Sequence, residues 1–324
     1  MPTCARKSAR GLSCIEQEEI RMSSIDDHDH GLVHDLEIIG RRIERRRALA
    51  WLAGTGAAFA LAGCGGGANE SASSSSTSGT TTTTTASSGS TSTSSGSTSG
   101  STSSGASCIA DPSETAGPYP ADGTNTSSGA TSNVLTASGI VRSDIRSSFI
   151  SSTTTAPGVQ VTLTLTLVNA SDGCTPLAGY AIYFWQCDRS GNYSLYGAPS
   201  ESYLRGVQVT DGNGQVTFVT IFPACYSGRY PHQHFEIYES LSAASAGRNA
   251  VLTSQLAMPA AICSAVYNDA SGYSESVTNF ARVSLDTDLV FGDNSAAQLA
   301  QQTPAMTGSV DAGYVATNAI AVAA

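Results

Sequence analysis

The chain has 324 residues and a formal net charge of −10. The acidic excess lies entirely after Cys64, where the chain contains no lysine. Nucleic acid and anionic lipid headgroups bind to basic surfaces, so this composition argues against either one as a direct partner of the folded part. The length allows one to three domains, and the distribution of residue types along the chain favours one.

The N-terminal residues 1–63 have the features of an export signal. A basic cluster, Arg45–Arg47, precedes the apolar run Ala48–Ala62. That run is too short to span a bilayer comfortably, but it matches the apolar region of a signal peptide. A short core helix is the alternative, although no long apolar partner lies nearby. The arginines resemble a twin-arginine signal, and general secretion uses basic signals too. Met22 is a second candidate start.

Cys64 ends a stretch, Leu61–Cys64, that resembles a bacterial lipoprotein signal. In such signals the cysteine is lipidated and becomes the first residue of the mature protein. Lipoproteins typically carry more than one acyl chain, which a stable anchor requires. We therefore expect an exported protein that touches a membrane only through lipid on Cys64, or that lies in the periplasm or at the cell surface.

Residues 64–107 consist almost entirely of Ser, Thr and Gly. Such a segment has too little apolar surface to offset the entropy lost on ordering, so we interpret it as a disordered, flexible tether. Residues 108–324 remain for folding, and their number suits one sizeable β domain.

Five stretches after the tether have the apolar patterns of β-strands. Residues 159–168 alternate between apolar and polar side chains, which is typical of a strand buried on one face. Asp211–Gly214 has the composition of a hairpin turn between two of the other strands. The five predicted strands are 159–168, 181–187, 207–210, 215–222 and 232–238.

Helical patterns are weak and short, at 240–246 and 296–302. Residues 270–324 are predicted to form further strand and loop. Strands at this spacing, separated by glycine-rich turns, indicate an all-β fold of the β-sandwich type.

His232 and His234 lie two residues apart in the last of the five predicted strands. Side chains at this spacing project from the same face of a strand, so the two imidazoles can chelate one metal ion. Most such pairs are ordinary strand residues. Here, however, the chain has five histidines in all, and the other three precede the apolar run of the signal. The pair therefore predicts a metal site.

Tyr193 and Tyr226 are candidate partners for the two histidines. Tyr193 follows the aromatic strand in the turn Asp188–Tyr193, and Tyr226 lies in the loop just before the histidine strand. Each is also compatible with an ordinary core or turn aromatic. No general spacing rule identifies either tyrosine as a ligand.

Several segments resemble the intradiol ring-cleavage dioxygenases, a family that includes the protocatechuate and catechol dioxygenases. The resemblance covers roughly residues 110–260 and is specific, because several motifs agree in order and spacing. It is closest to an exported, lipoprotein-like branch. The segments are Glu114–Pro120, Trp185–Ser194, Leu204–Phe218, Pro223–Tyr226 and His232–Phe235.

The resemblance implies a non-haem Fe(III) ion bound by Tyr193, Tyr226, His232 and His234. Phenolate oxygen is a hard donor and imidazole a borderline one, which suits ferric iron better than Cu(I). The charge of the ion would lower the pKa of both tyrosines and make them phenolates at neutral pH.

The activity implied is cleavage of a small aromatic diol by O2 between its adjacent hydroxyls, giving a cis,cis-muconate-type diacid. The ion acts as Lewis acid and template. Tyr226 matches the tyrosinate that leaves the metal and takes a substrate proton. Arg229 matches an arginine that stabilises charge on the substrate, although a surface arginine is the alternative. Gln255 and Tyr119 match positions at the substrate pocket. A homo-oligomer is compatible with the resemblance.

Five cysteines follow Cys64, and disulfides persist in an exported protein. An odd number leaves at least one unpaired. Cys187 and Cys225 each lie close in sequence to a candidate tyrosine ligand, so we expect that a bridge between them could brace the site. The five are Cys108, Cys174, Cys187, Cys225 and Cys263.

Two non-catalytic functions compete with the enzyme. A surface-tethered β-sandwich could bind a partner or a glycan, and a metal-scavenging lipoprotein could bind iron without turnover; neither the export signal nor the fold excludes them. The presence of all four ligand positions in the family's order favours the enzyme.

Overall fold

The computed structural model describes residues 109–127 and 129–324. The predicted export signal in 1–63, the lipidated Cys64 and the tether 64–107 lie outside these residues. Within them, no helix is long and apolar enough to cross a membrane.

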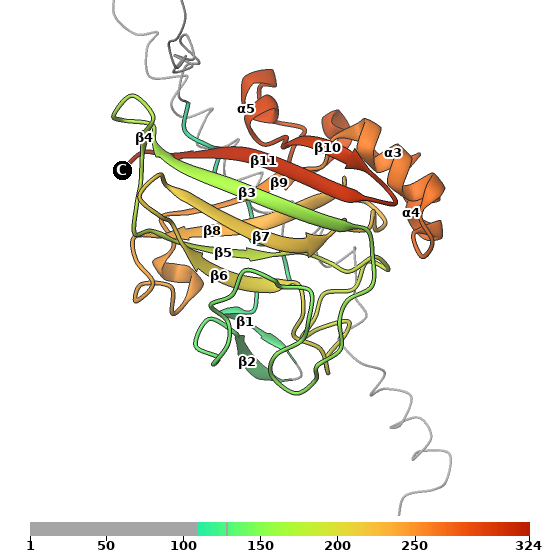
Figure 1. Ribbon diagram of the computed structural model, residues 1–324, viewed down its shortest axis with the longest axis horizontal. Coiled ribbons are helices and arrows are strands. Elements are labelled where there is room, and N and C mark those ends of the chain that lie inside the picture. The colour runs from blue at the N-terminus through green and yellow to red at the C-terminus, as the bar shows by residue number, and fades with distance from the viewer. Residues whose placement is uncertain (1–108, 128) are drawn as a thin grey trace, which may run out of the picture. The chain divides into compact units, whose positions relative to one another are not determined.

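Two β-sheets form the framework of the described residues, as expected for a β-sandwich (Figure 1). The strand order of the first sheet is β10-β11-β3-β4, and β7 also pairs with β3. Its strands are β3 (Gln160–Asn169), β4 (Thr175–Pro176), β7 (Gln215–Ile221), β10 (Ala305–Ser309) and β11 (Gly313–Val322).

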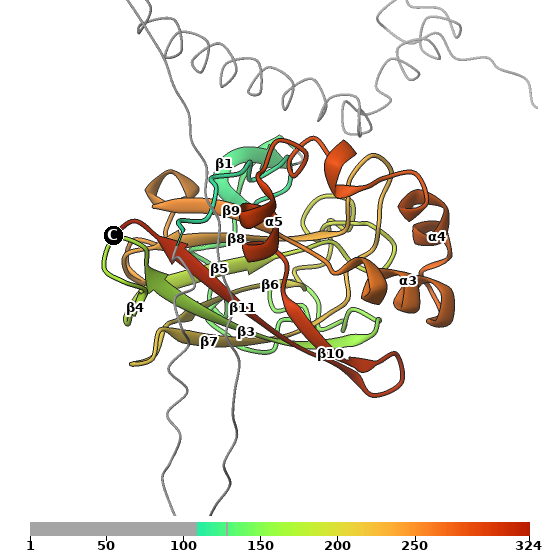
Figure 2. The same cartoon turned by 90° about the horizontal axis from the view of Figure 1, so that it is seen from above.

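The second sheet has the order β6-β5-β8-β9 and is antiparallel throughout. Its strands are β5 (Ala181–Trp185), β6 (Arg205–Val209), β8 (His232–Tyr238) and β9 (Leu252–Ala257). A separate hairpin of β1 (Asp122–Ser127) and β2 (Ala130–Asn133) lies on the side of this sheet that faces away from the first sheet (Figures 1 and 2).

The alternation of side chains explains the layers. In β3 the apolar residues Val161, Leu163, Leu165 and Leu167 are fully buried, whereas the threonines between them are not. They face the second sheet and share one core with Phe184 of β5 and Phe235 of β8, among others. Burying a side chain of this size contributes about 1.5–3 kcal/mol, which makes this interface the main source of stability.

β5 and β8 are buried on both faces, unlike β3. Their even and odd positions therefore pack into different environments. Tyr183 and Trp185 of β5 leave the sandwich core and join a second cluster with Tyr193 and Ala224. Because His234 is paired with Trp185 across the sheet, the histidines belong to this outer face. The candidate site thus lies between the second sheet and the loops that cover it.

The helices follow the second sheet in sequence. They are α3 (Ala260–Asp269), α4 (Ser274–Phe280) and α5 (Ala296–Gln301), with short 3-10 turns η1 (Gly247–Asn249) and η2 (Leu285–Thr287). α3 and α4 lie together at the end of the sheets opposite the C-terminus (Figures 1 and 2).

The predicted strands agree with the structure to within about two residues at their ends, a normal margin for strand boundaries. The predicted helical stretch at 240–246 is wrong, because these residues form turns. The stretch at 296–302 corresponds to α5. The expectation of further strand and loop in 270–324 missed α4, and α3 was not predicted either.

Candidate metal centre

The two histidines of β8 point to the same side and meet at their tips. His232 Nε2 lies 3.1 Å from His234 Nε2, and both side chains are buried. The ring of His234 stacks on Trp185, with 4.9 Å between ring centroids and 6° between the planes. A central strand with hydrogen-bonded neighbours on both sides, β5 and β9, thus holds the pair.

Both candidate tyrosines bring their hydroxyls to the histidine tips. Tyr193 Oη lies 3.0 Å from His234 Nε2 and 3.5 Å from His232 Nε2. Tyr226 Oη lies 3.1 Å from His232 Nε2. The four side chains that the sequence singled out therefore converge on one point, although they come from a strand and two separate loops.

The loop of Tyr193 is shaped by its own sequence. The carboxylate of Asp188 accepts hydrogen bonds from the backbone N–H groups of Ser190 and Asn192, at 2.8 and 3.0 Å. Gly191 between them has a φ of +89°, in the left-handed region that favours glycine. A Cβ there would lie 3.2 Å from Cβ of Tyr226, so glycine also lets the two tyrosine loops approach each other.

The loop of Tyr226 is held by residues of α3 and α4. Tyr267 Oη donates to the Pro223 carbonyl at 3.0 Å and Tyr273 Oη donates to the Phe222 carbonyl at 2.8 Å. Cys225 is held on both sides: its N–H donates to the Ser276 hydroxyl at 3.0 Å, and its carbonyl accepts from the Asn279 amide at 2.9 Å. The backbone that precedes Tyr226 is therefore fixed from outside.

One contact determines the protonation of His232. Its Nδ1 lies 2.6 Å from the Tyr230 carbonyl oxygen, which can only accept. Nδ1 therefore carries the proton, and Nε2 presents a lone pair to the centre, as a metal ligand must. Burial lowers the pKa of both imidazoles well below the ordinary value, and the charge of Arg229 lowers it further. Both rings are thus neutral donors.

The residues present fit a cation. Burial raises the pKa of Tyr193 and Tyr226 above the ordinary value, so only a nearby positive charge would make them phenolates at neutral pH. The donor atoms lie 3.0 to 3.5 Å apart, close to the separation of roughly 3.3 Å expected around a tetrahedral ion with bonds of about 2 Å. The described residues contain no cluster of three or more His, Cys, Asp and Glu. The oxygen donors seen at the histidine tips are the hydroxyls of Tyr193 and Tyr226.

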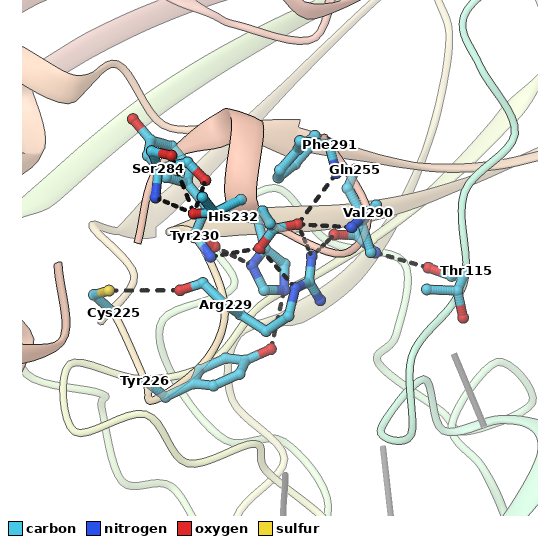
Figure 3. A network of polar contacts seen from close by, with 12 residues as sticks. Thr115, Cys225, Tyr226, Arg229, Tyr230, His232, Gln255, Ser284, Val290 and Phe291 are labelled. Carbon is cyan, nitrogen blue, oxygen red and sulfur yellow. Dashed lines mark hydrogen bonds and ion pairs between the residues drawn. The ribbon is translucent and has the colours of Figure 1, made fainter. Parts of the chain in front are cut away.

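Arg229 is buried and belongs to the site, so the alternative of a surface arginine is wrong. Its Nε donates to Asp288 Oδ2 at 2.9 Å, and its Nη2 donates to Gln255 Oε1 at 2.8 Å. Gln255 in turn donates through Nε2 to the Thr115 carbonyl at 2.9 Å (Figure 3). Gln255 lies beside His234 in the pairing of β9 with β8.

The segment that contains Tyr119 closes another side of the centre. The ring of Tyr119 packs on Tyr193, with 5.2 Å between the centroids. Gly117 has a φ of +71°, and a Cβ at this position would lie 3.4 Å from Cε1 of His234. The segment therefore runs directly against a candidate ligand.

Two functional contacts escaped the sequence analysis. Asp288 is buried beside Arg229, and Arg205 is fully buried with its guanidinium donating to the carbonyls of Tyr119, Pro120 and Ser194. For Arg205 the signal was its place between Leu204 and Gly206–Val207, at the start of a strand whose first three residues are buried. No comparable signal distinguishes Asp288 from the other acids of the C-terminal region.

The predicted bridge between Cys187 and Cys225 is wrong, because both are free thiols, as is Cys263. Cys187 Sγ donates to the Ala224 carbonyl and Cys225 Sγ to the Arg229 carbonyl. Burial raises the pKa of the Cys225 thiol to about 12, so it remains protonated and unreactive. Cys174 is disulfide-bonded. The site is therefore braced by hydrogen bonds and packing, with no disulfide at these two positions.

Residues 140–260 match the family described as Dioxygenase. The solved structures that are similar to this chain include the following three. An intradiol ring-cleavage dioxygenase from Tetranychus urticae shares 25% identity, covering 66% of this chain and 94% of that chain, with a TM-score of 0.48. The dioxygenase domain of a dioxygenase carbohydrate-binding protein fusion from Streptomyces sp. SirexAA-E shares 24%, covering 57% and 94%, with a TM-score of 0.34.

The third is catechol 1,2-dioxygenase from Pseudomonas arvilla C-1, with 18% identity, coverage of 65% of this chain and 61% of that chain, and a TM-score of 0.38. No curated protein matches the chain. Because all three TM-scores lie below 0.5, the assignment rests on the family match and on the motifs that the site brings together. Residues 140–260 match a dioxygenase domain, and the residues that meet at this site are among those by which the chain resembles the intradiol ring-cleavage dioxygenases.

Proposed function

We propose that this protein is a non-haem Fe(III) enzyme that uses O2 to cleave a catechol-type aromatic between its two hydroxyls, giving a cis,cis-muconate-type diacid. The observation that carries the proposal is the convergence of Tyr193, Tyr226, His232 and His234 on one buried point. These four side chains would hold the ion. When bound, ferric iron supplies Lewis acidity that draws electron density from a catechol and prepares its ring for O2.

The two tyrosines are placed for different roles. Tyr193 is buried and contacts both histidines. Of the two histidines, Tyr226 bonds His232 alone; it is partly exposed and precedes the exposed Ser227. The tyrosine that leaves the metal ion when the substrate binds, and accepts a substrate proton, must be the less enclosed of the two tyrosines. This difference supports Tyr226 as the base that takes the proton of one substrate hydroxyl at Oη.

Arg229 supplies a fixed positive charge beside the donors. Only 5% of its side chain is exposed, so the surrounding water cannot screen the charge effectively. A charge held in place before the reaction stabilises negative charge that develops on the substrate. Gln255 holds the same guanidinium through Nη2 and fixes its distance from His234.

The chain's N-terminal sequence supports an exported enzyme. We propose that residues 1–63 direct export, that Cys64 carries the lipid anchor, and that 64–107 tether a catalytic domain formed by 108–324. Mass spectrometry of the mature N-terminus would test this. A protein that starts before Cys64, or one without lipid on Cys64, would contradict the anchor while leaving the enzyme untouched.

Turnover of the purified protein tests the enzyme directly. The protein is loaded with Fe(III), and catechol and O2 consumption are followed together with the product's absorbance. The proposal predicts one O2 consumed for each catechol and loss of turnover without O2. Tyr226→Phe should lose at least about 10²-fold in kcat, because loss of a correctly placed proton acceptor costs about this much. Tyr180→Phe is the matched control. Tyr180 precedes the first residue of β5, at the opposite end of that strand from Trp185.

Iron binding without catechol loss would refute the enzyme and favour a metal-scavenging lipoprotein. A Tyr226→Phe variant with full turnover would show that the proton acceptor is another group.

A further inference from the structure

We propose that Asp288 is a positioning residue for catalysis, which orients the guanidinium of Arg229 at the metal centre. The inference rests on the proposed function, because it assigns Arg229 its orientation within that same site. Asp288 lies in the C-terminal part of the chain, 59 positions after Arg229 and outside the residues 140–260 that match the dioxygenase family.

The contact between the two side chains has two points. Arg229 Nε donates to Asp288 Oδ2 at 2.9 Å, and Nη2 donates to Oδ1 at 3.3 Å (Figure 3). Two parallel N–H···O contacts between a planar guanidinium and a carboxylate fix the plane of the guanidinium as well as its distance. The side chains are nearly or fully enclosed, with 5% and 0% exposed. Among the described residues, Asp288 is the acid that forms an ion pair with the buried guanidinium of Arg229.

The carboxylate of Asp288 is itself fixed independently of Arg229. Oδ1 accepts from the N–H groups of Val290 and Phe291 at 2.9 and 3.2 Å, and Oδ2 accepts from the N–H of Tyr230 at 2.6 Å. The turn is closed by Gly292, where a Cβ would lie 2.7 Å from the Asp288 carbonyl oxygen. Asp288 is therefore a fixed support for the long side chain of Arg229.

The contact with Tyr230 extends this support to a candidate metal ligand. Asp288 holds the N–H of Tyr230, and the carbonyl of Tyr230 accepts from Nδ1 of His232 at 2.6 Å. The carboxylate is thus anchored to the backbone just before His232, which fixes the position of Asp288 relative to the candidate ligands.

The arrangement leaves one nitrogen of Arg229 for the substrate. Nε and Nη2 are engaged by Asp288 and Gln255, whereas Nη1 donates to none of the residues in 109–127 and 129–324. Because the guanidinium plane is fixed, the N–H bonds of Nη1 point in fixed directions. Asp288 thereby determines where the charge of Arg229 lies relative to a bound catechol.

Asp288→Asn is the first test, with Asp286→Asn as the matched control. Asp286 lies in the same turn but is exposed. Both oxygens of Asp288 accept at least two N–H groups, so an amide in either orientation turns its NH2 toward donors. We expect kcat to fall by about 10²-fold, the cost of misplacing a catalytic group by about 1 Å. KM and iron content should stay within about threefold, because the four donors are retained. Asp286→Asn should behave as wild type.

A double-mutant cycle separates positioning from a purely structural role. If Asp288 acts through Arg229, then adding Asp288→Asn to Arg229→Gln should lower kcat by less than about threefold beyond Arg229→Gln alone. A full additional loss of about 10²-fold would overturn the proposal. Wild-type kcat in Asp288→Asn would also overturn it.

Arg229→Lys covers the case in which Asp288→Asn does not fold. Lysine keeps the charge but cannot form the two-point contact, and Asp288 retains its backbone partners. We expect a loss of kcat similar to that of Asp288→Asn. Full kcat in Arg229→Lys would show that orientation is not required and would refute the proposal.

A metal-free measurement keeps this inference distinct from the proposed function. Thermal unfolding of the iron-free variants should show that the melting-temperature losses of Asp288→Asn and Arg229→Gln are not additive, because the two side chains form one contact. Additive losses would refute the contact itself. Wild-type protein that binds no iron or cleaves no catechol would refute the proposed function alone, since the iron-free cycle does not depend on it.

Discussion

The region that matches the dioxygenase family, 140–260, and the region after it, 261–324, divide the candidate site between them. The first supplies all four candidate donors and Arg229. The second supplies no donor, but it holds the loop of Tyr226 through α3 and α4 and holds Arg229 through Asp288. Part of the contacts that immobilise the reactive groups is therefore encoded outside the region that matches the family.

The second region is also part of the core and cannot be treated as an appendage. Val266 and Tyr267 of α3 pack into the same core cluster as Phe184 and Phe235. β11 pairs in parallel with β3, from Tyr314 opposite Val161 to Val322 opposite Asn169. Variants in the first region should consequently lose metal binding or turnover directly. Variants in the second should lose stability and, through it, the positions of the reactive groups.

The largest effect is expected from removing a donor in the first region. His232→Ala should lose iron and lower turnover by more than about 10²-fold, which is the upper end of the cost of removing a partner outside the ligand set. Iron content and kcat measured on the same samples check this. Retention of iron at the wild-type level would mean that His232 is not a ligand, and the division between the regions would fail.

A smaller effect is expected from a support in the second region. Tyr273→Phe removes the hydroxyl that donates to the Phe222 carbonyl at 2.8 Å and accepts from the Val159 N–H at 3.2 Å. Leaving such buried groups without a partner costs about 1–3 kcal/mol in the free energy of unfolding. Denaturant unfolding measures the loss, and kcat should fall with iron still bound.

Tyr314→Phe is the control for that variant, because Tyr314 is also a buried tyrosine and its hydroxyl bonds none of the described residues. Its free energy of unfolding should stay within about 0.5 kcal/mol of wild type. If both variants lose stability equally, the support of the loop is not the reason.

The smallest effect on turnover is expected at Asp111, where the change concerns stability and its dependence on pH. Asp111 Oδ2 accepts from the Ala321 N–H of β11 at 2.7 Å, while its buried Oδ1 bonds none of the described residues. Burial raises the pKa of Asp111 to about 6, from 3.8. The folded protein thus binds this proton more tightly than the unfolded chain, so the contribution of Asp111 to stability falls as pH rises from about 4 to about 6.

Asp111→Asn should remove this pH dependence, because the amide cannot ionise. At pH 7 the variant should be more stable than wild type by an amount on the order of 2 kcal/mol, and the difference should vanish near pH 4. Thermal unfolding across this range checks the prediction, with exposed Asp311→Asn as control. A difference that does not change with pH would contradict the raised pKa.

Local patterns in the sequence predicted much of the fold and the donors. Alternation identified β3, and the two-residue spacing placed His232 and His234 on one face. Tyr193 and Tyr226 came from the family's motifs, since nothing in their spacing indicates that two loops meet at the histidines. Those motifs are local in sequence even though the site is not.

Contacts between distant parts of the chain could not be predicted in the same way. Asp288 meets Arg229 only because η2 and the turn after it return to the end of the second sheet. The expected bridge between Cys187 and Cys225 failed because closeness in sequence to the two tyrosines did not determine where each thiol points. Such details depend on the tertiary arrangement, which an isolated pattern does not contain.

The visible absorption spectrum of the iron-reconstituted protein tests the central claim most directly. If Tyr193 and Tyr226 bind Fe(III) as phenolates beside His232 and His234, the protein is coloured by charge transfer from tyrosinate to iron. The band should change when catechol is added without O2. A protein that remains colourless after exposure to ferric iron would contradict the account.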